Sequence, residues 1–127
     1  VTFALKADKE SYAKGEKVLL TMTLRNKGSE ACGVPQADNA CNSGVVVVDG
    51  AKQVWPSGPQ PMYACVLTYT PLAAGATTHA TFTWDQTEWV CDAAAAGPCY
   101  QRVAPGVYTA TGHWIGGADA GTSFKLL

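Results

Sequence analysis

The chain has 127 residues, of which 47% are hydrophobic and 15% are charged, and its net charge is −1 at pH 7. The length predicts a single domain over residues 1–127 with one core, and the hydrophobic content argues against a disordered chain. Lys and Arg are interleaved with Asp and Glu, so the basic patch that nucleic acid binding needs is missing. No apolar run approaches the roughly 20 residues of a membrane-spanning helix, and we expect no membrane span. No signal-peptide pattern follows Val1, so we expect a mature chain or an excised fragment.

The first two predicted strands lie close to the N-terminus. Apolar and polar residues alternate from Thr2 to Ala7, and they alternate again without a slip from Val18 to Arg25. A period of two is typical of a strand with one buried and one solvent-facing side. On the second strand the predicted buried side consists of Val18, Leu20, Met22 and Leu24. We expect the rest of the fold to be organised around this strand.

The middle of the chain contains the strongest hairpin signal. Ser29 to Gly44 is rich in Gly, Pro, Asn and Asp, and we expect this stretch to be irregular. Val45 to Val48 then runs into Asp49-Gly50 and Lys52 to Trp55, which predicts a β-hairpin because Asp-Gly favours the tight turn. Four consecutive Val residues indicate a strand that is covered on both faces, or that is covered by another chain.

The second half of the chain predicts more strands and one long insertion. Three Pro residues within Pro56–Pro61 predict a loop there. Turn-forming residues predict a turn at Pro71–Gly75, and Gly-rich sequence predicts a hairpin loop at Gly116–Gly121. An insertion occupies residues 86–104, within the long stretch from Asp85 to Ala104, and a helical turn is conceivable at Ala93–Ala96. Strands are predicted at Met62–Thr70, His79–Trp84, Val107–Trp114 and Thr122–Leu127.

These elements predict the fold class. Seven to eight short strands, turn signals about every 8–12 residues and no amphipathic helix predict an all-β, immunoglobulin-like antiparallel β-sandwich. An up-and-down barrel is the alternative. Tyr108 follows Gly106 at the start of a strand, as the structural residue of a tyrosine corner does. We expect one core containing Val18, Leu20, Met22, Leu24, Phe82, Trp84, Tyr108 and Trp114.

Five cysteines are many for a chain of this length, and none has the CxxC spacing of a zinc ribbon or a redox pair. Disulfides formed in an oxidising compartment are the better interpretation, and they predict a secreted or cell-surface protein. Cys91 and Cys99 flank a short loop that a bridge between them would close. A second bridge would come from Cys32, Cys41 and Cys65, and the sequence does not choose among these pairings. Because five is odd, at least one thiol is free or pairs between chains.

Four segments together resemble a known family. They are Tyr12 to Asn26, Val45 to Trp55, Leu72 to Asp85 and Pro105 to Gly112. In this order they are similar to the BsuPI-type bacterial proteinase-inhibitor domain, over roughly residues 12–115. The resemblance implies an immunoglobulin-like sandwich and proteinase inhibition, and it implies no single reactive-site residue. The cysteines are not part of the family pattern, the insertion is longer than the family's, and the name-giving member is intracellular.

Catalytic and metal sites find little support in the sequence. His79 and His113 are both predicted to face outward on strands of different sheets, and a metal site needs convergent ligands. Two places could supply oxygen ligands to calcium: Asp119, and the group of Asp38, Asn39 and Asn42. Neither has the spacing of a calcium loop, so we interpret these residues as turn formers. No nucleophile lies at a strained strand-to-helix turn. We therefore expect no enzyme, no metal and no cofactor.

The insertion is the predicted working surface. Loops carry function when a rigid scaffold holds them, and this is the longest connection between predicted strands. Its candidate binding residues are Glu88, Trp89, Val90 and Asp92. Trp89 either contacts a partner or packs the insertion onto the body of the domain, and the sequence does not distinguish these roles.

Two functions follow as hypotheses. The first is a non-catalytic extracellular module that binds a protein partner, such as a protease, through loops. Bracing such a loop would lower the entropy that is lost on binding. The second is a structural subunit of a bacterial cell-surface layer or filament, in which the partner is a neighbouring copy of the chain. A low charge, an unpaired cysteine and open sheet edges would suit such self-assembly.

Overall fold

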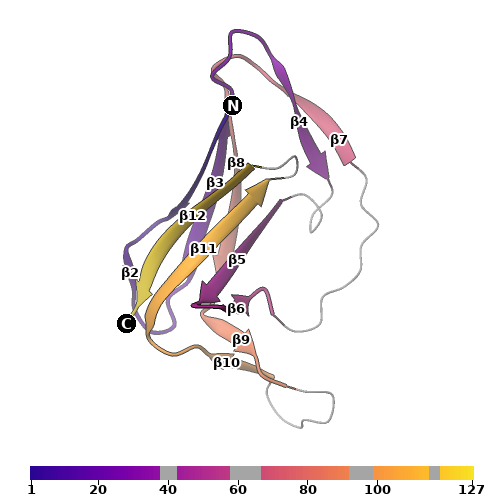
Figure 1. Ribbon diagram of the computed structural model, residues 1–127. Coiled ribbons are helices and arrows are strands. Elements are labelled where there is room, and N and C mark those ends of the chain that lie inside the picture. Colours follow the sequence, from indigo (N-terminus) through magenta and orange to yellow (C-terminus); the bar gives the residue numbers. More distant parts are fainter. Residues whose placement is uncertain (38–42, 58–66, 92–98, 115–117) are drawn as a thin grey trace.

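The computed structural model describes residues 1–37, 43–57, 67–91, 99–114 and 118–127, and its regular elements in these ranges are strands (Figure 1). No helix in this part of the chain could span a membrane. The strands are β1 (Thr2–Ala7), β2 (Ser11–Tyr12), β3 (Val18–Arg25), β4 (Cys32–Ala37), β5 (Ser43–Asp49), β6 (Lys52–Trp55), β7 (Leu67–Leu72), β8 (Thr77–Trp84), β9 (Thr87–Trp89), β10 (Tyr100–Arg102), β11 (Gly106–Trp114) and β12 (Ala118–Leu126).

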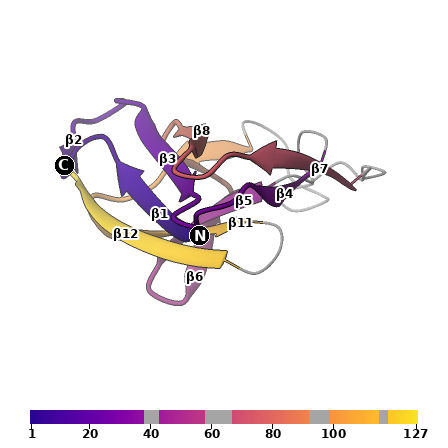
Figure 2. The ribbon, with the colours of Figure 1, turned by 90° about the horizontal axis from the view of Figure 1, so that it is seen from above.

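Two sheets form an immunoglobulin-like β-sandwich, as the sequence predicts. One sheet has the order β1-β3-β8 and the other has the order β2-β12-β11-β5-β6, so the two sheets contain eight strands. Every pair in them is antiparallel except the short parallel pair of β2 and β12. Figure 2 shows β1 and β3 lying over the sheet that contains β11 and β12. Two smaller ribbons, β4-β7 and β9-β10, extend from the sandwich.

The core lies between the two sheets and contains the residues predicted for it. The four alternating residues of β3 are buried, as are Trp84, Tyr108 and Trp114, whereas Phe82 is half-buried against them. The Trp84 ring meets the rings of Tyr108 and Phe124 edge-on, at centroid distances of 5.8 and 6.3 Å. Such contacts add about 0.5–1.5 kcal/mol each to the stabilisation from burial. This aromatic cluster joins β8 of one sheet to β11 and β12 of the other.

Two local predictions are also confirmed. β5 and β6 form a hairpin around Asp49-Gly50, in which Gly50 has φ of 59°. The Tyr108 hydroxyl donates a hydrogen bond to the Ala104 carbonyl at 2.6 Å, which is the contact of a tyrosine corner. In β5 every second Val is buried, and Val46 and Val48 on the outer face are half-buried. The outer face of this strand is therefore partly covered within the single chain.

Several predicted boundaries were wrong. Ser29 to Gly44 is not irregular throughout, because β4 forms there and pairs with β7. β12 begins at Ala118, so residues 118–121 of the predicted Gly-rich loop belong to a strand. The predicted strand at Met62–Thr70 is described only from Leu67 onward, as β7, and this strand continues to Leu72. The possible helical turn at Ala93–Ala96 lies outside the described residues.

The two sheets lie close together at Gly112. It is buried in β11, and a Cβ atom added there would lie 2.8 Å from the Met22 sulfur and 3.5 Å from a Leu5 methyl. Both neighbours are buried core side chains on the opposite sheet. Glycine at this position therefore lets β11 pack directly onto β3.

We expect Gly112→Ala to destabilise the fold by about 1–3 kcal/mol, because the added methyl overpacks a filled interior. Gly44→Ala is the matched control, since Gly44 is exposed on the neighbouring β5 and a Cβ atom there meets nothing within 4 Å. Urea denaturation of both variants measures the difference. Equal stability of the two variants would show that the Met22 side chain moves aside without cost and would contradict the tight packing inferred here.

Candidate functional site

The candidate site lies at the end of the sandwich where β8 leads into β9 (Figure 1, lower part). β9 and β10 form an antiparallel hairpin in which Trp89 lies opposite Tyr100 and Thr87 lies opposite Arg102. The Val90 N–H donates to the Cys99 carbonyl at 2.7 Å, which extends the pairing beyond the strands. The described part of the predicted insertion therefore contains a strand pair.

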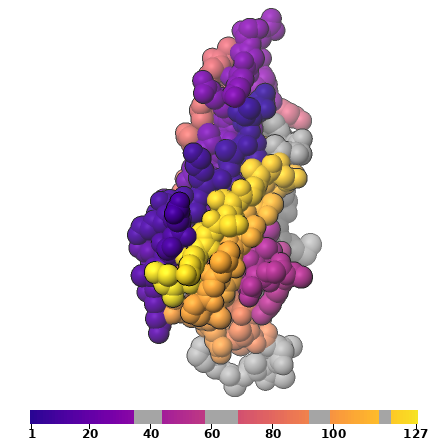
Figure 3. Space-filling view, turned by 60° about the vertical axis from the view of Figure 1, so that its left-hand side comes forward, coloured from indigo at the N-terminus to yellow at the C-terminus, as the bar shows by residue number. Residues whose placement is uncertain are grey.

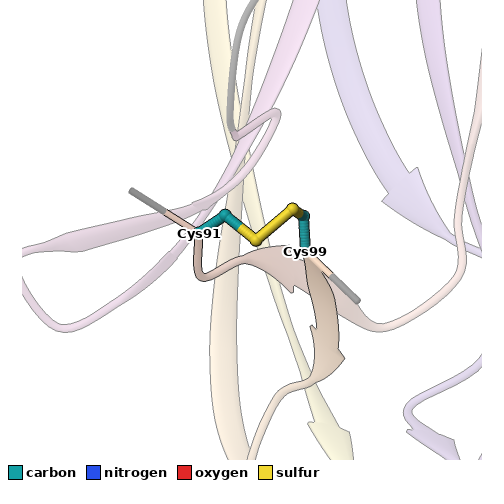
Figure 4. Close-up of a disulfide and its surroundings, with 2 residues drawn as sticks. All are labelled: Cys91 and Cys99. Atoms are coloured by element: carbon teal, nitrogen blue, oxygen red, sulfur yellow. A yellow bond between two sulfur atoms is a disulfide. The ribbon is translucent and has the colours of Figure 1, made fainter. Parts of the chain in front are cut away.

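A disulfide between Cys91 and Cys99 closes this hairpin, which confirms the predicted pairing (Figure 4). The two Cα atoms are 4.8 Å apart, and the bridge spans a sequence separation of 8. Cys32 on β4 is a free, half-buried thiol. The second bridge was predicted among Cys32, Cys41 and Cys65, and the latter two lie outside the described residues.

Gln86 joins the hairpin to the body of the sandwich. Its side chain is fully buried, and its φ of 66° turns the chain from β8 into β9. The side-chain amide Nε2 donates to the carbonyls of Ala13 and Glu16, at 2.9 and 2.8 Å, in the turn that precedes β3. The Gln86 carbonyl accepts a hydrogen bond from the Val103 N–H at 2.9 Å. One residue thus links the turn before β3, the end of β8 and the segment after β10.

Further polar contacts hold both strands of the hairpin. The Glu88 carboxylate forms an ion pair with Lys52 of β6 at 3.0 Å, and the Trp89 N–H donates to Ser57 Oγ at 2.8 Å. On β10, the Arg102 guanidinium donates to the Leu127 carbonyl at 3.1 Å. The hairpin is therefore attached to β6 on one side and to the C-terminal end of β12 on the other.

The four predicted binding residues have different environments. The Glu88 side chain is only 19% exposed and is paired with Lys52, so Glu88 holds the hairpin in place. Trp89 is half-buried, and its ring meets the Tyr100 ring edge-on at 5.3 Å. Val90 is 44% exposed, and Asp92 lies outside the described residues.

Tyr100 is an exposed aromatic residue that the sequence analysis missed. It is 52% exposed at the start of β10, directly after the bridged Cys99. A sequence signal was present, because residues that flank a disulfide-closed turn pair across the hairpin and Trp89 lies near the other cysteine. Among the described residues of this hairpin, the exposed apolar side chains are therefore Val90 and Tyr100, and the Trp89 ring packs against the Tyr100 ring.

A surface groove of about 480 Å³ lies beside the hairpin. On one side, Asp85 Oδ1 accepts hydrogen bonds from the Thr87 N–H at 3.1 Å and from the Thr87 hydroxyl at 2.5 Å. On the other side, Gln53 Nε2 donates to the Pro56 carbonyl at 2.8 Å, which fixes the segment after β6. The groove is lined by Lys17, Trp55, Pro56, Ser57, Thr83, Asp85, Thr87 and Tyr100.

Neither histidine lines this groove. His79 is exposed on β8, with Nδ1 3.0 Å from the Thr23 hydroxyl, and His113 is exposed on β11, with Nδ1 2.7 Å from Asp119. The two residues are on different sheets, as predicted. Asp119 itself lies in a strand and not in a turn. Within the described ranges, no group of three or more His, Cys, Asp or Glu residues could hold a metal ion.

One pKa shift occurs close to the site. Burial raises the pKa of Tyr108, and the negative charges of Asp49 and Glu88 raise it further. The raised pKa keeps the hydroxyl protonated, and this protonated form donates to Ala104 at the end of the segment that follows β10.

Comparisons with known proteins identify the fold and no function. No protein-family model matches the chain, and no curated protein matches its sequence. Among solved structures, a β-glucosidase from Erythrobacter marinus matches 99% of this chain with a TM-score of 0.57 and 16% identity. A β-glucosidase from Listeria innocua matches 98% with a TM-score of 0.52 and 14% identity. The chain spans 15% and 16% of the lengths of these enzymes. At such low identity the likeness shows a shared fold alone.

We expect Gln86→Ala to destabilise the protein by about 1–3 kcal/mol, because the two hydrogen bonds from the buried amide to the partly buried carbonyls of Ala13 and Glu16 are lost. Gln86→Glu tests the donor specifically, since the side chain keeps its size but loses the amide N–H groups. Gln101→Ala is the control, because Gln101 is exposed on the same hairpin. Urea denaturation gives the free energies of unfolding. A Gln86 variant as stable as the Gln101 variant would contradict the anchoring role.

We expect Cys91→Ser combined with Cys99→Ser to lower stability by about 2–3 kcal/mol, because opening a loop of this length restores conformational entropy to the unfolded chain. Cys32→Ser is the control. Mass spectrometry of unreduced, alkylated peptides should find Cys91 joined to Cys99 and Cys32 alkylated. A peptide that links Cys91 or Cys99 to a different cysteine would contradict the pairing, and a bridge at Cys32 would contradict its free thiol.

Proposed function

We propose that this chain is a non-catalytic extracellular binding module that binds a protein partner through the β9-β10 hairpin. The observation that carries the proposal is the disulfide-closed hairpin, which is anchored at Gln86 and Glu88 and exposes Val90 and Tyr100. The disulfide supports a location in an oxidising compartment, such as the cell surface or the medium.

Anchoring matters because binding costs conformational entropy. A free hairpin would have to be ordered when a partner binds, at about 0.5–1.5 kcal/mol for each side chain that is immobilised. Here the Cys91–Cys99 bridge and the hydrogen bonds of Gln86 and Trp89 already order the hairpin in the folded protein, before a partner binds. An exposed Tyr with an aromatic neighbour is also the residue type that contributes most to protein interfaces.

The outer face of the five-stranded sheet is a weaker candidate surface (Figure 3). Its side chains on β11 and β12 are largely small or polar, and several bond to one another. The Thr109 hydroxyl lies 3.3 Å from the Ser123 hydroxyl, and His113 is paired with Asp119. Such a surface offers a partner few unpaired groups and few large apolar side chains.

A protease is the partner that the resemblance to BsuPI-type inhibitors implies, and a closed, braced hairpin is a suitable shape for a protease cleft. A neighbouring copy of this chain is the alternative partner. Assembly of that kind would make the protein a structural subunit of a cell-surface layer or filament. These two partners are distinguished by titration against proteases and by the state of association in solution.

We expect Tyr100→Ala and Val90→Asp each to weaken inhibition of a sensitive serine protease at least about 10-fold, because both remove exposed contact area at the hairpin. Tyr69→Ala is the matched control, since Tyr69 is 68% exposed on β7 of the other ribbon. Trp89→Ala should weaken binding as well, through loss of its contact with Tyr100. The measurement titrates trypsin, chymotrypsin, elastase and subtilisin with each variant, and thermal melting checks the fold.

Inhibition that survives both hairpin substitutions would place the binding surface elsewhere. If no protease is inhibited and sedimentation velocity shows ordered oligomers that Tyr100→Ala dissolves, the structural-subunit alternative gains support. A chain that is monomeric and inhibits none of the four enzymes would argue against both partners.

A further inference from the structure

The groove beside the hairpin combines two aromatic residues from different parts of the fold. Trp55 is half-buried at the end of β6, and Tyr100 is exposed at the start of β10. Aromatic faces attract flat apolar surfaces and weakly positive C–H groups. A sugar ring has such a face, because its axial C–H groups gather on one side while its hydroxyl groups extend around the rim.

Apart from Pro56, the other described lining residues are polar, and they include one positive and one negative charge. Thr83, Asp85 and Thr87 lie along one side, and Lys17 supplies a positive charge near the negative charge of Asp85. A phosphate or carboxylate ligand would meet the Asp85 carboxylate, and a cationic ligand would meet the Lys17 ammonium. Neither residue takes part in an ion pair among the described residues. An uncharged ligand that both donates and accepts hydrogen bonds suits this lining best.

The groove is also held in shape before any ligand arrives. Asp85 is fixed by its two hydrogen bonds from Thr87, and the segment after Trp55 is fixed by the bond from Gln53 to the Pro56 carbonyl. Tyr100 is held by the Trp89 ring and by the neighbouring disulfide. The volume of about 480 Å³ lies within the ~300–1,000 Å³ range of small-molecule sites.

Four of the lining residues, Lys17, Thr83, Asp85 and Tyr100, are exposed, so the groove is open to solvent along its length. An open groove can accept an internal segment of a chain-like ligand, whereas an enclosed cavity would accept only a free monosaccharide. We propose that this groove binds a neutral oligosaccharide, with Trp55 and Tyr100 stacking against sugar rings and Asp85, Thr83 and Lys17 bonding to hydroxyl groups. This site goes beyond the proposed protein-binding function and does not depend on it.

The first test uses the wild-type protein and hexasaccharides of β-1,4-glucose, β-1,3-glucose, α-1,4-glucose, β-1,4-xylose and β-1,4-N-acetylglucosamine. Each sugar is titrated into 15N-labelled protein up to 10 mM. The range extends to millimolar concentrations because small ligands often bind weakly. At least one should shift the indole N–H signal of Trp55 in a saturable way. The indole N–H signal of Trp114, which is buried at the C-terminal end of β11 and does not line the groove, should not shift. No saturable shift with any of the five sugars would overturn the proposal.

Variants then locate the binding. Tyr100→Ala, Trp55→Phe and Asp85→Asn should each raise the dissociation constant of the bound sugar at least 5-fold, and Tyr69→Ala should leave it within 2-fold. Asp85→Asn keeps an acceptor for Thr87, and Trp55→Phe keeps an aromatic ring, so both variants should remain folded, as thermal melting would show. Sugar affinity unchanged in all three groove variants would overturn the assignment of the site.

Val90→Asp separates this proposal from the protein-binding one. Val90 lies on the hairpin and does not line the groove, so this substitution should weaken protease binding and leave sugar binding unchanged. If Trp55→Phe and Asp85→Asn instead weaken protease binding while no sugar binds, the groove belongs to the protein interface and the carbohydrate proposal fails.

Discussion

One buried amide group anchors the β9-β10 hairpin to the sandwich. Gln86 places two donors against carbonyls of the turn before β3, and its own carbonyl receives the Val103 N–H. A two-stranded hairpin is marginally stable by itself in water. The β9-β10 pair is ordered because Gln86, the bridge and the contacts of Glu88 and Trp89 act together. Removing the amide would break both hydrogen bonds to the turn before β3, and the Glu16 carbonyl would lose the donor that Gln86 supplies.

A second amide does similar work at the opposite end of the sandwich. Asn26 is buried, and its Nδ2 donates to the carbonyls of Glu30 and Leu72 while its Oδ1 accepts from the Gly28 N–H. In the described part of the chain, Asn26 and Gln86 are the buried polar residues. Between them, the described core is largely apolar and aromatic. The two amides hold surface segments in place at the two ends of the sandwich.

The sequence predicts the sandwich because alternation is a local signal. β3, β8 and β11 each have one apolar side, and the Asp49-Gly50 turn and the corner formed by Tyr108 are also set by neighbouring residues. β4, β9 and β10 were missed because they lack a clear alternation and are stabilised by pairing with other strands, and β9 and β10 are also short. The pairing of Glu88 with Lys52, 36 positions away in the sequence, has no local signature. The same reason explains why the sequence proposed Glu88 for binding and overlooked Tyr100, whose exposure depends on how the hairpin is attached.

The β-sandwich, here called the frame, and the candidate site differ in how closely they constrain the sequence. Many sequences satisfy a period of two, so a sandwich can be shared by proteins with little identity and different functions. The β9-β10 end of the molecule constrains its sequence more closely. It needs an amide side chain on a residue with a left-handed backbone, two cysteines at the ends of a hairpin and an aromatic residue after the second cysteine. Replacing any alternating core residue by another apolar one of similar size preserves the frame. Replacing Gln86, Cys91 or Tyr100 changes which surface is presented and how rigidly it is held. A shared function is therefore to be sought in chains that keep these residues, and not in chains that share only the frame.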